Sequence, residues 1–572
     1  MGFVACLLIV MRPILASGLD LGFGERGDGI IEIAILEHWR NILTLGGGWT
    51  SAYYFHPYAN SLGYNDGYLL YGLVYTVWRM FVDPFHADTL NILTFKTIGF
   101  VATYILIASA LRWGRRIALL IACLFTVASN VALQAVHAQL QSVALLPVAM
   151  ILAIALVRAE GEARRVRARP LAVALAALMA AWLLTSYYMA WFTIFSACLF
   201  AACWLAMTGL WRPRRLWVFL RFHAGTLVCG GASFLLFIVP FLAVYLPKLH
   251  ETGGEDYHEM LGYLVTPVID MINVGPGNYL WGWIFRPLMG LLHAIFPHDP
   301  ALPGRVLGGE HETGFPLVFF VLIVTGLRKI LTAPRHPAGQ PPSTELRAFA
   351  LAMTIAWLLT LQFWTASPWS LVFHLIPGAK GMRVVSRYQI WLTLPFLLIV
   401  AAAWRTRLAA IARARPLLAV CIVLLLIAEN LSSETAAQLR RSEHRAALAG
   451  IAPPPAGCAV FYVTASRRAE PLYMNAYMNA RYPHNVDAML LAELWRTPTI
   501  NGFSTFNPPD WNFEAPLAAD YDARVMRYAA QHRLHGVCRL DVRRSTPWTR
   551  MTVETLTRRM SMRPRDGMPA GW

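Results

Sequence analysis

Two acidic residues near the N-terminus have the surroundings of a catalytic carboxylate. Asp28 stands between two glycines before the apolar-periodic run 30–43, and Asp66 stands before the apolar run 67–81. Each could accept unpaired N–H groups at the start of a helix, which is a common structural role. Each could equally act as a general base that takes a proton from a hydroxyl, or as a metal ligand. Asp28 and Asp66 are therefore the candidate catalytic residues, with both roles open.

The run 30–43 predicts an amphipathic helix that lies flat at a membrane surface, with its charged residues toward water or a cavity. Adjacent Glu37 and His38 point about 100° apart on a helix, so they are not expected to share one site. His38 is expected to be a solvated interfacial histidine. Glu37, together with His56 in Phe55-His56-Pro57, is a candidate substrate contact.

Three cations precede the apolar run 389–404: Lys380, Arg383 and Arg387. They could bind lipid head groups, or they could hold the phosphate of a lipid-linked substrate together with helix-end N–H groups. His137, in a short turn between two apolar runs, is either a partner for a helix end or a further substrate contact.

The remaining sequence features do not indicate a specific reaction. Tyr187 and Tyr188 follow an apolar run where an aromatic belt would place them without any function. The chain has no Gly-rich phosphate loop, Cys-x-x-Cys pair, His-Glu-x-x-His or Gly-x-Ser-x-Gly. Nucleotide hydrolysis, zinc proteolysis and serine esterase chemistry therefore have no support. No cofactor is expected, and a divalent metal is possible but unsupported.

The elements that must position these residues are membrane helices. Of the 572 residues, 57% are hydrophobic and 14% are charged, and the apolar runs have about the length that crosses a bilayer. The net charge of +17 comes from basic clusters between those runs. Such clusters mark cytoplasmic loops and do not indicate nucleic acid binding.

We expect eleven crossings, with the N-terminus inside. They are 1–17, 90–111, 117–134, 141–157, 171–185, 189–210, 222–246, 314–331, 347–364, 389–404 and 416–429. Residues 67–81 are expected to lie in the outer leaflet without crossing it, because a further crossing would put every later basic cluster outside. An odd number of crossings places residues 430–572 on the outer side, which is periplasmic in a Gram-negative cell.

The predicted fold is therefore an all-α polytopic membrane protein with a small C-terminal α/β domain outside the cytoplasm. The membrane domain covers 1–430, with outer loops 18–89 and 248–313. The α/β domain covers 431–545, with strands at 459–464 and 536–542 and a helix at 520–532. Residues 546–572 are expected to be disordered or on the membrane surface. Cys458 and Cys538 could form a disulfide, which spacing alone does not decide.

Taken together, the Gly27-Asp28 loop, the 55–66 segment, His137-x-Gln139 and Arg383-x-x-x-Arg387 resemble bacterial membrane proteins of the GT-C glycosyltransferase superfamily, in particular the YfhO-like branch. The resemblance covers about the first 430 residues. It implies transfer of a sugar from a polyprenyl-phosphate carrier to an unidentified acceptor, with Asp28 as the base and the two arginines on the donor phosphate. His137 and Gln139 stand where a second acidic motif is usual, so metal dependence stays open.

Two other functions remain open. A transporter or flippase of a lipid-linked glycan would need polar residues deep in the spans, for which Lys96 is the main candidate. A non-catalytic scaffold would merely present the C-terminal domain. The tail pattern 485–504 is either turn chemistry or a loop facing carbohydrate.

Overall fold

The computed structural model describes residues 2–551 apart from 162–164, 296, 298–306, 334–341 and 466–475. The contacts divide the chain into two compact units. Unit 1 comprises residues 1–25 and 66–439, and unit 2 comprises residues 26–65 and 440–572. The tail expected at 546–572 lies outside the described residues from 552 onward.

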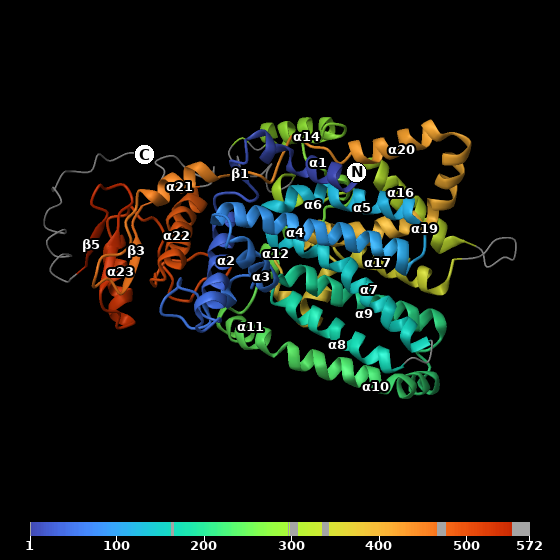
Figure 1. Cartoon of the computed structure of the whole chain (residues 1–572), viewed down its shortest axis with the longest axis horizontal. Helices are drawn as coiled ribbons and strands as arrows, with labels where there is room; N and C mark the ends of the chain where they lie inside the picture. Colours follow the sequence, from blue (N-terminus) through green and yellow to red (C-terminus); the bar gives the residue numbers. More distant parts are fainter. Residues whose placement is uncertain are drawn as a thin grey trace. The chain divides into compact units, whose positions relative to one another are not determined.

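Unit 1 is built almost entirely from helices (Figure 1). They are α1 (Gly2–Ala16), α3 (Leu69–Trp78), α4 (Pro84–Ile105), η2 (Leu106–Ala110), α5 (Arg115–Val127), α6 (Ser129–Leu133), η3 (Gln134–Val136), η4 (Ala138–Leu145), α7 (Leu146–Gly161), α8 (Arg165–Leu183), α9 (Tyr187–Thr208), α10 (Pro213–Phe237), α11 (Val239–Thr252), α12 (Tyr257–Leu261), α13 (Ile269–Ile272), α14 (Gly282–Ile295), η5 (Gly309–His311), α16 (Leu317–Thr332), α17 (Thr344–Leu359), α18 (Trp369–Leu375), η6 (Ala379–Gly381), η7 (Val385–Arg387), α19 (Tyr388–Ala414) and α20 (Pro416–Ala428). Two short strands, β1 (Leu21–Gly22) and β2 (Leu439–Arg440), stand near the boundaries between the units.

Six helical stretches among the described residues are long and apolar enough to cross a membrane: 84–110, 115–136, 138–161, 187–208, 213–237 and 385–414. They coincide with six of the eleven expected crossings, and the polytopic helical character is confirmed to that extent. The other five crossings fall on α1, α8, α16, α17 and α20, which are not among the six. Eleven crossings therefore stay a prediction. Within the apolar run 67–81 the helix, α3, has only ten residues.

Unit 2 contains a three-stranded sheet between two helices. The strands are β3 (Val460–Val463), β4 (Val537–Leu540) and β5 (Trp548–Arg550), with β3 parallel and β5 antiparallel to β4. Side chains alternate across a strand. Val460 and Tyr462 pack in the core that includes α23 (Tyr521–Gln531), whereas Phe461 and Val463 pack in the core that includes α22 (Ala476–Trp495). Both strands and the helix expected here are present, and β5 adds a strand where a disordered or membrane-surface tail was expected from residue 546.

Unit 2 also contains α2 (Asp28–Leu45), which packs against α22, as well as η1 (Ser61–Tyr64) and α21 (Arg441–Ala449). The sequence pattern assigned α2 to a membrane surface with its charges toward water or a cavity. His38 was expected to be solvated, and that expectation is wrong because the side chain is 1% exposed. Glu37 does not face water either, because it is 0% exposed. The partners of His38, Trp49 and Glu493, lie outside the run 30–43, so periodicity within the run could not reveal them. Glu37 pairs with Arg40, three residues further along the same helix.

Candidate functional site

The first turn of α9 connects an acidic residue to the predicted cation segment. The Tyr187 backbone N–H donates to Asp66 Oδ1 at 2.9 Å. The Tyr188 hydroxyl accepts the backbone N–H groups of Arg383 and Val384 at 2.9 and 3.1 Å. One helix end therefore holds the Asp66 carboxylate and the backbone that carries Arg383. These tyrosines have a role that the aromatic-belt interpretation missed.

A tight backbone approach fixes the segment before Arg383. The Tyr187 hydroxyl donates to the Gly378 carbonyl at 2.7 Å, and Trp191 Nε1 donates to the Pro377 carbonyl at 3.0 Å. Gly378 has φ +84°, and a Cβ there would lie 2.2 Å from the Tyr187 hydroxyl oxygen. Only glycine fits this position without displacing the helix end.

Asp66 does not cap the helix that follows it, since α3 has Tyr68 as its N-cap and no side-chain cap. It accepts instead from α9 and from the side chain of Gln139. Gln139 Oε1 in turn accepts from the Tyr68 hydroxyl at 2.7 Å. Burial raises the pKa of Asp66, and the Tyr187 N–H and the charge of Arg387 offset part of that shift. A carboxylate with a raised pKa is a better proton acceptor when ionised.

Arg387 forms a two-point ion pair with Glu310, a residue that the motif search did not single out. Arg387 Nε donates to Glu310 Oε2 at 2.9 Å, and Nη2 donates to Oε1. His137 Nε2 lies 3.1 Å from the same Oε1. Burial opposes ionisation, but the charges of Arg387 and His137 hold the pKa of Glu310 well below its usual range. The run Glu310-His311-Glu312 before an apolar run was the available signal.

The turn η5 that carries Glu310 is fixed from several sides. Ser386 Oγ donates to the Glu310 carbonyl at 2.8 Å, and Gln134 Nε2 donates to the Gly309 carbonyl at 2.7 Å. His311 lies with Nδ1 2.8 Å from Asp270 Oδ2 and Nε2 3.0 Å from the Gly262 carbonyl. Burial lowers the pKa of His311, but Asp270 outweighs burial and the net shift is upward. Both ring nitrogens face acceptors, an arrangement that favours the protonated imidazole, and these two contacts fix the turn.

Arg383 differs from Arg387 in its charge partners. Its guanidinium lies 5.4 Å from the centre of the Tyr263 ring. It pairs with no carboxylate among the described residues, and within them its buried Nε has no hydrogen-bond partner. Glu255 acts on it through charge alone, and burial raises the pKa of Glu255 to about 7. Lys380 is exposed, with Nζ 5.9 Å from the Phe373 ring centre, and it does not join the arginines.

Asp28 and the other N-terminal candidates belong to unit 2. Asp28 is the first residue of α2, whose N-cap is Gly27 without a side-chain cap, so the capping role is not found. Its Oδ1 accepts from the Tyr482 hydroxyl at 3.3 Å. Glu37 pairs with Arg40 Nη1 at 3.2 Å.

Two histidines of unit 2, His38 and His56, interact with other residues of the same unit. His38 Nε2 lies 2.8 Å from the Trp49 carbonyl and its Nδ1 lies 3.6 Å from Glu493. Burial lowers the pKa of His56, and the charge of His532 lowers it further. The His56 carbonyl accepts from the Tyr528 hydroxyl at 3.1 Å.

The tail pattern 485–504 includes a buried polar network. Asn501 Oδ1 accepts from the Val463 N–H at 2.8 Å, and its Nδ2 donates to Asn485 Oδ1 at 2.7 Å. Asn485 Nδ2 donates to the Phe513 carbonyl at 3.0 Å. Asn485 and Asn501 are fully buried. Their contacts hold β3 and α22 together, so they have a structural explanation and do not face a sugar.

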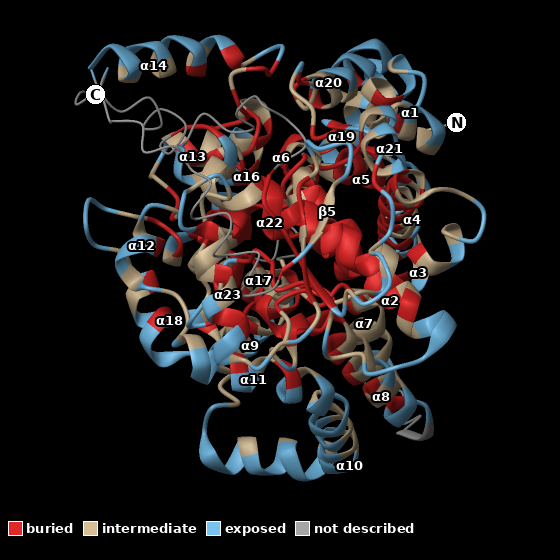
Figure 2. Ribbon diagram, turned by 90° about the vertical axis from the view of Figure 1, so that its left-hand side faces the viewer, coloured by how far each residue is buried: buried red, intermediate tan, exposed pale blue. Residues whose placement is uncertain are grey.

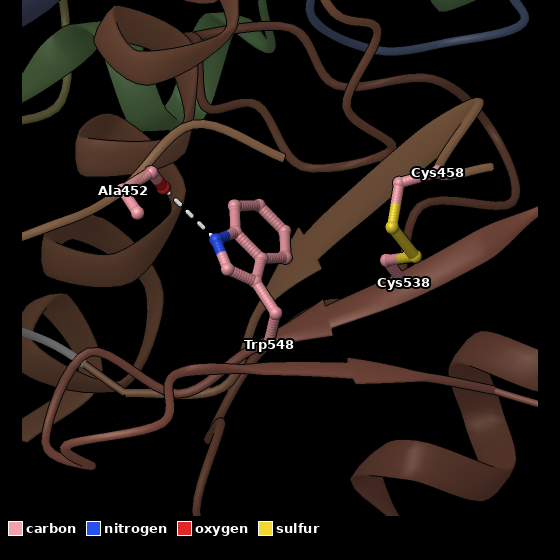
Figure 3. Close-up of a disulfide and its surroundings, with 4 residues drawn as sticks. All are labelled: Ala452, Cys458, Cys538 and Trp548. Carbon is pink, nitrogen blue, oxygen red and sulfur yellow. Dashed lines mark hydrogen bonds between the residues drawn. A yellow bond between two sulfur atoms is a disulfide. The ribbon is translucent and has the colours of Figure 1, made fainter. Parts of the chain in front are cut away.

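Unit 2 contains a disulfide between Cys458 and Cys538, with Cα atoms 5.6 Å apart (Figure 3). Trp548 of β5 lies near it and donates from Nε1 to the Ala452 carbonyl at 2.9 Å. A structural disulfide is typical of an oxidising compartment.

Among the described residues, no group of three or more His, Cys, Asp or Glu side chains has the geometry of a metal site. No protein-family model matches the chain, and no curated protein matches it. The site is therefore characterised by its own geometry. The first turn of α9 holds the Asp66 carboxylate and the backbone of Arg383, whose guanidinium pairs with no carboxylate among the described residues, and Arg387, Glu310 and His137 form a separate fixed cluster.

Proposed function

We propose that this protein is a glycosyltransferase of the bacterial cytoplasmic membrane that moves a sugar from a polyprenyl-phosphate carrier to an acceptor on the outer face. The observation that carries the proposal is that the first turn of α9 holds both the Asp66 carboxylate and the backbone N–H of Arg383. A base and a phosphate-binding cation are what glycosyl transfer from a phosphate needs. A lipid-linked donor has its phosphate at the membrane surface, where the ends of apolar helices lie.

The proposed reaction assigns one role to each group. Asp66 takes the proton from the acceptor hydroxyl, whose oxygen forms the new bond to the anomeric carbon. The bond from that carbon to the phosphate oxygen breaks, and the phosphate leaves with the electron pair. Arg383 stabilises the charge on the leaving phosphate. Arg387 is already neutralised by Glu310, so it is a positioning residue and not a second phosphate clamp.

Chain connectivity supports a common side for these groups. Residue 65 is the last residue of the first segment of unit 2, and Asp66 is the residue at which the chain returns to unit 1. The chain re-enters unit 2 at residue 440. A folded unit cannot straddle the bilayer, so residues 66–439 must cross an even number of times. The ten crossings expected there satisfy this condition, and the disulfide favours the outer side for unit 2.

Asp28 is the second candidate for the base. It lies in unit 2, and its carboxylate is engaged by Tyr482. The family resemblance favours Asp28, whereas the contacts of unit 1 favour Asp66, and separate variants distinguish them.

A transporter of a lipid-linked glycan is the alternative that one observation favours. Lys96 is 6% exposed within the stretch 84–110, and its Nζ donates to Gln141 Oε1 at 2.9 Å. No described carboxylate pairs with it. A buried cation in a span is a functional candidate in its own right. A non-catalytic scaffold is a third possibility, which predicts that neither Asp66 nor Lys96 matters.

The test compares Asp66→Asn, Asp28→Asn and Lys96→Met in the native host, with each variant quantified in the membrane. If the protein is an enzyme that uses Asp66, Asp66→Asn should lower the rate of sugar transfer by about 10²-fold or more, and one envelope glycan should be lost. A transporter instead loses glycan flux in Lys96→Met while keeping it in Asp66→Asn. Full glycan decoration in every variant would contradict both active functions and leave the scaffold.

A further inference from the structure

Helix α14 carries a strip of exposed apolar side chains. Trp283, Leu291 and Ile295 are 66%, 55% and 56% exposed. At about 100° per residue, these three lie within about 120° of the helix surface. The buried residues of the helix, Gly282 and Phe285, lie outside this arc. Figure 2 shows α14 as largely exposed along its length.

Polar groups occupy another side of the same helix. His293 follows Leu291 by two residues, which puts it about 200° around the helix. Arg286 also lies outside the apolar arc, and its Nε donates to the Pro276 carbonyl at 2.7 Å. An exposed apolar arc with polar residues outside it is typical of a helix that lies in a membrane interface.

The attachment of α14 sets its depth. Just before the helix, Asn278 Nδ2 donates to the Glu429 carbonyl at 2.9 Å, and the Tyr279 N–H donates to the Leu431 carbonyl at 3.1 Å. Trp281 Nε1 donates to Glu429 Oε2 at 3.4 Å. Glu429 directly follows α20, so α14 starts where that apolar helix ends.

The exposed side chains of α20 indicate that lipid surrounds this helix. Leu417 and Leu424 of α20 are 81% and 59% exposed. In a membrane-spanning chain, leucines exposed to this degree face lipid. The apolar arc of α14 therefore begins next to a lipid-facing surface, at the level where polar residues resume.

We propose that α14 docks onto the bilayer, with Trp283, Leu291 and Ile295 inserted at the boundary between head groups and acyl chains. The occupant of the exposed face is phospholipid. This inference needs only the membrane character of the chain and does not depend on glycosyl transfer.

The test uses the full-length protein in nanodiscs of phosphatidylcholine and phosphatidylglycerol. A benzophenone amino acid replaces Leu291 in one sample and His293 in a matched control, and mass spectrometry measures lipid adducts after illumination. The same probe at Leu424 is the positive control for lipid contact. Because position 293 faces away from the apolar arc, Leu291 should give about tenfold more lipid adduct than His293.

Equal adduct yields at 291 and 293 would overturn the proposal, as would crosslinks from 291 to another segment of the chain. If the probe at Leu291 perturbs folding on size-exclusion chromatography, Ile295 on the same arc replaces it. Lipid adducts from Ile295 would support the proposal, and their absence beside a working Leu424 control would refute it. A failure of the glycan experiment would leave these adducts unchanged.

Discussion

The Tyr188 hydroxyl is the contact on which the organisation of the candidate site depends. It is the acceptor for the N–H groups of both Arg383 and Val384, at 2.9 and 3.1 Å. Tyr188→Phe removes that oxygen with little change in shape and leaves two backbone donors without their partner. Each unsatisfied donor costs about 1–3 kcal/mol, so we expect a loss of about 2–6 kcal/mol in the local opening free energy of residues 382–386.

Hydrogen exchange measured by mass spectrometry on the full-length protein in nanodiscs reports this opening directly. A loss of about 2–6 kcal/mol corresponds to exchange at 383 and 384 that is roughly 30- to 10⁴-fold faster. The adjacent Tyr187→Phe is the matched control. It removes a single donor to Gly378, which is worth about 1 kcal/mol, and should accelerate exchange by less than about tenfold. Unchanged exchange at 383 and 384 in Tyr188→Phe would refute the proposed role of the α9 end.

Three further predictions concern other parts of the chain. Gly378→Ala puts a methyl group 2.2 Å from the Tyr187 oxygen at a positive φ, so it should lower thermal stability in detergent, whereas Gly290→Ala, with no atom within 4 Å of the added Cβ, should not. Although burial alone lowers it, Glu493 raises the net pKa of His38 in the folded state. The contribution of His38 to stability is therefore complete below the unfolded-state pKa of about 6.5 and is lost as the pH rises through the pKa of the folded state. Proteolysis of residues 26–65 should accelerate at alkaline pH in the wild type and not in His38→Gln. Loss of the disulfide in a Cys458→Ser, Cys538→Ser double variant opens a loop with a sequence separation of 80 and should destabilise unit 2 by about 4 kcal/mol, measured by thermal unfolding against the oxidised wild type.

The sequence predicted features that depend on local periodicity and composition. The six long apolar helices and the β3, α23 and β4 elements follow from patterns within short windows. The assignment of α2 failed because its burial depends on residues more than 400 positions away. Glu493 accepts from Asn41 Nδ2 at 3.2 Å and from the Tyr53 N–H at 2.9 Å, and these contacts join the N-terminal segment to α22.

The candidate site was predicted only in part, because its contacts also join residues that are distant in the sequence. Asp66, His137 and Arg387 were selected by type and position, and the fold brings the charges of His137 and Arg387 to bear on Asp66. Glu310 was missed because its role comes from neutralising Arg387, which spacing in the sequence cannot show. Tyr188 was missed because a hydroxyl that accepts backbone N–H groups leaves no motif.

Everything proposed for catalysis requires Arg383 and unit 2 to face the outer side of the membrane. The most direct measurement is labelling of intact cells with a membrane-impermeant thiol reagent. The positions are Lys380→Cys near Arg383, Gln531→Cys in unit 2 and Arg407→Cys in a basic cluster, with the wild type as the blank. We predict that positions 380 and 531 react in intact cells and that position 407 reacts only after permeabilisation. Reaction of 380 and 531 from opposite sides would contradict the account.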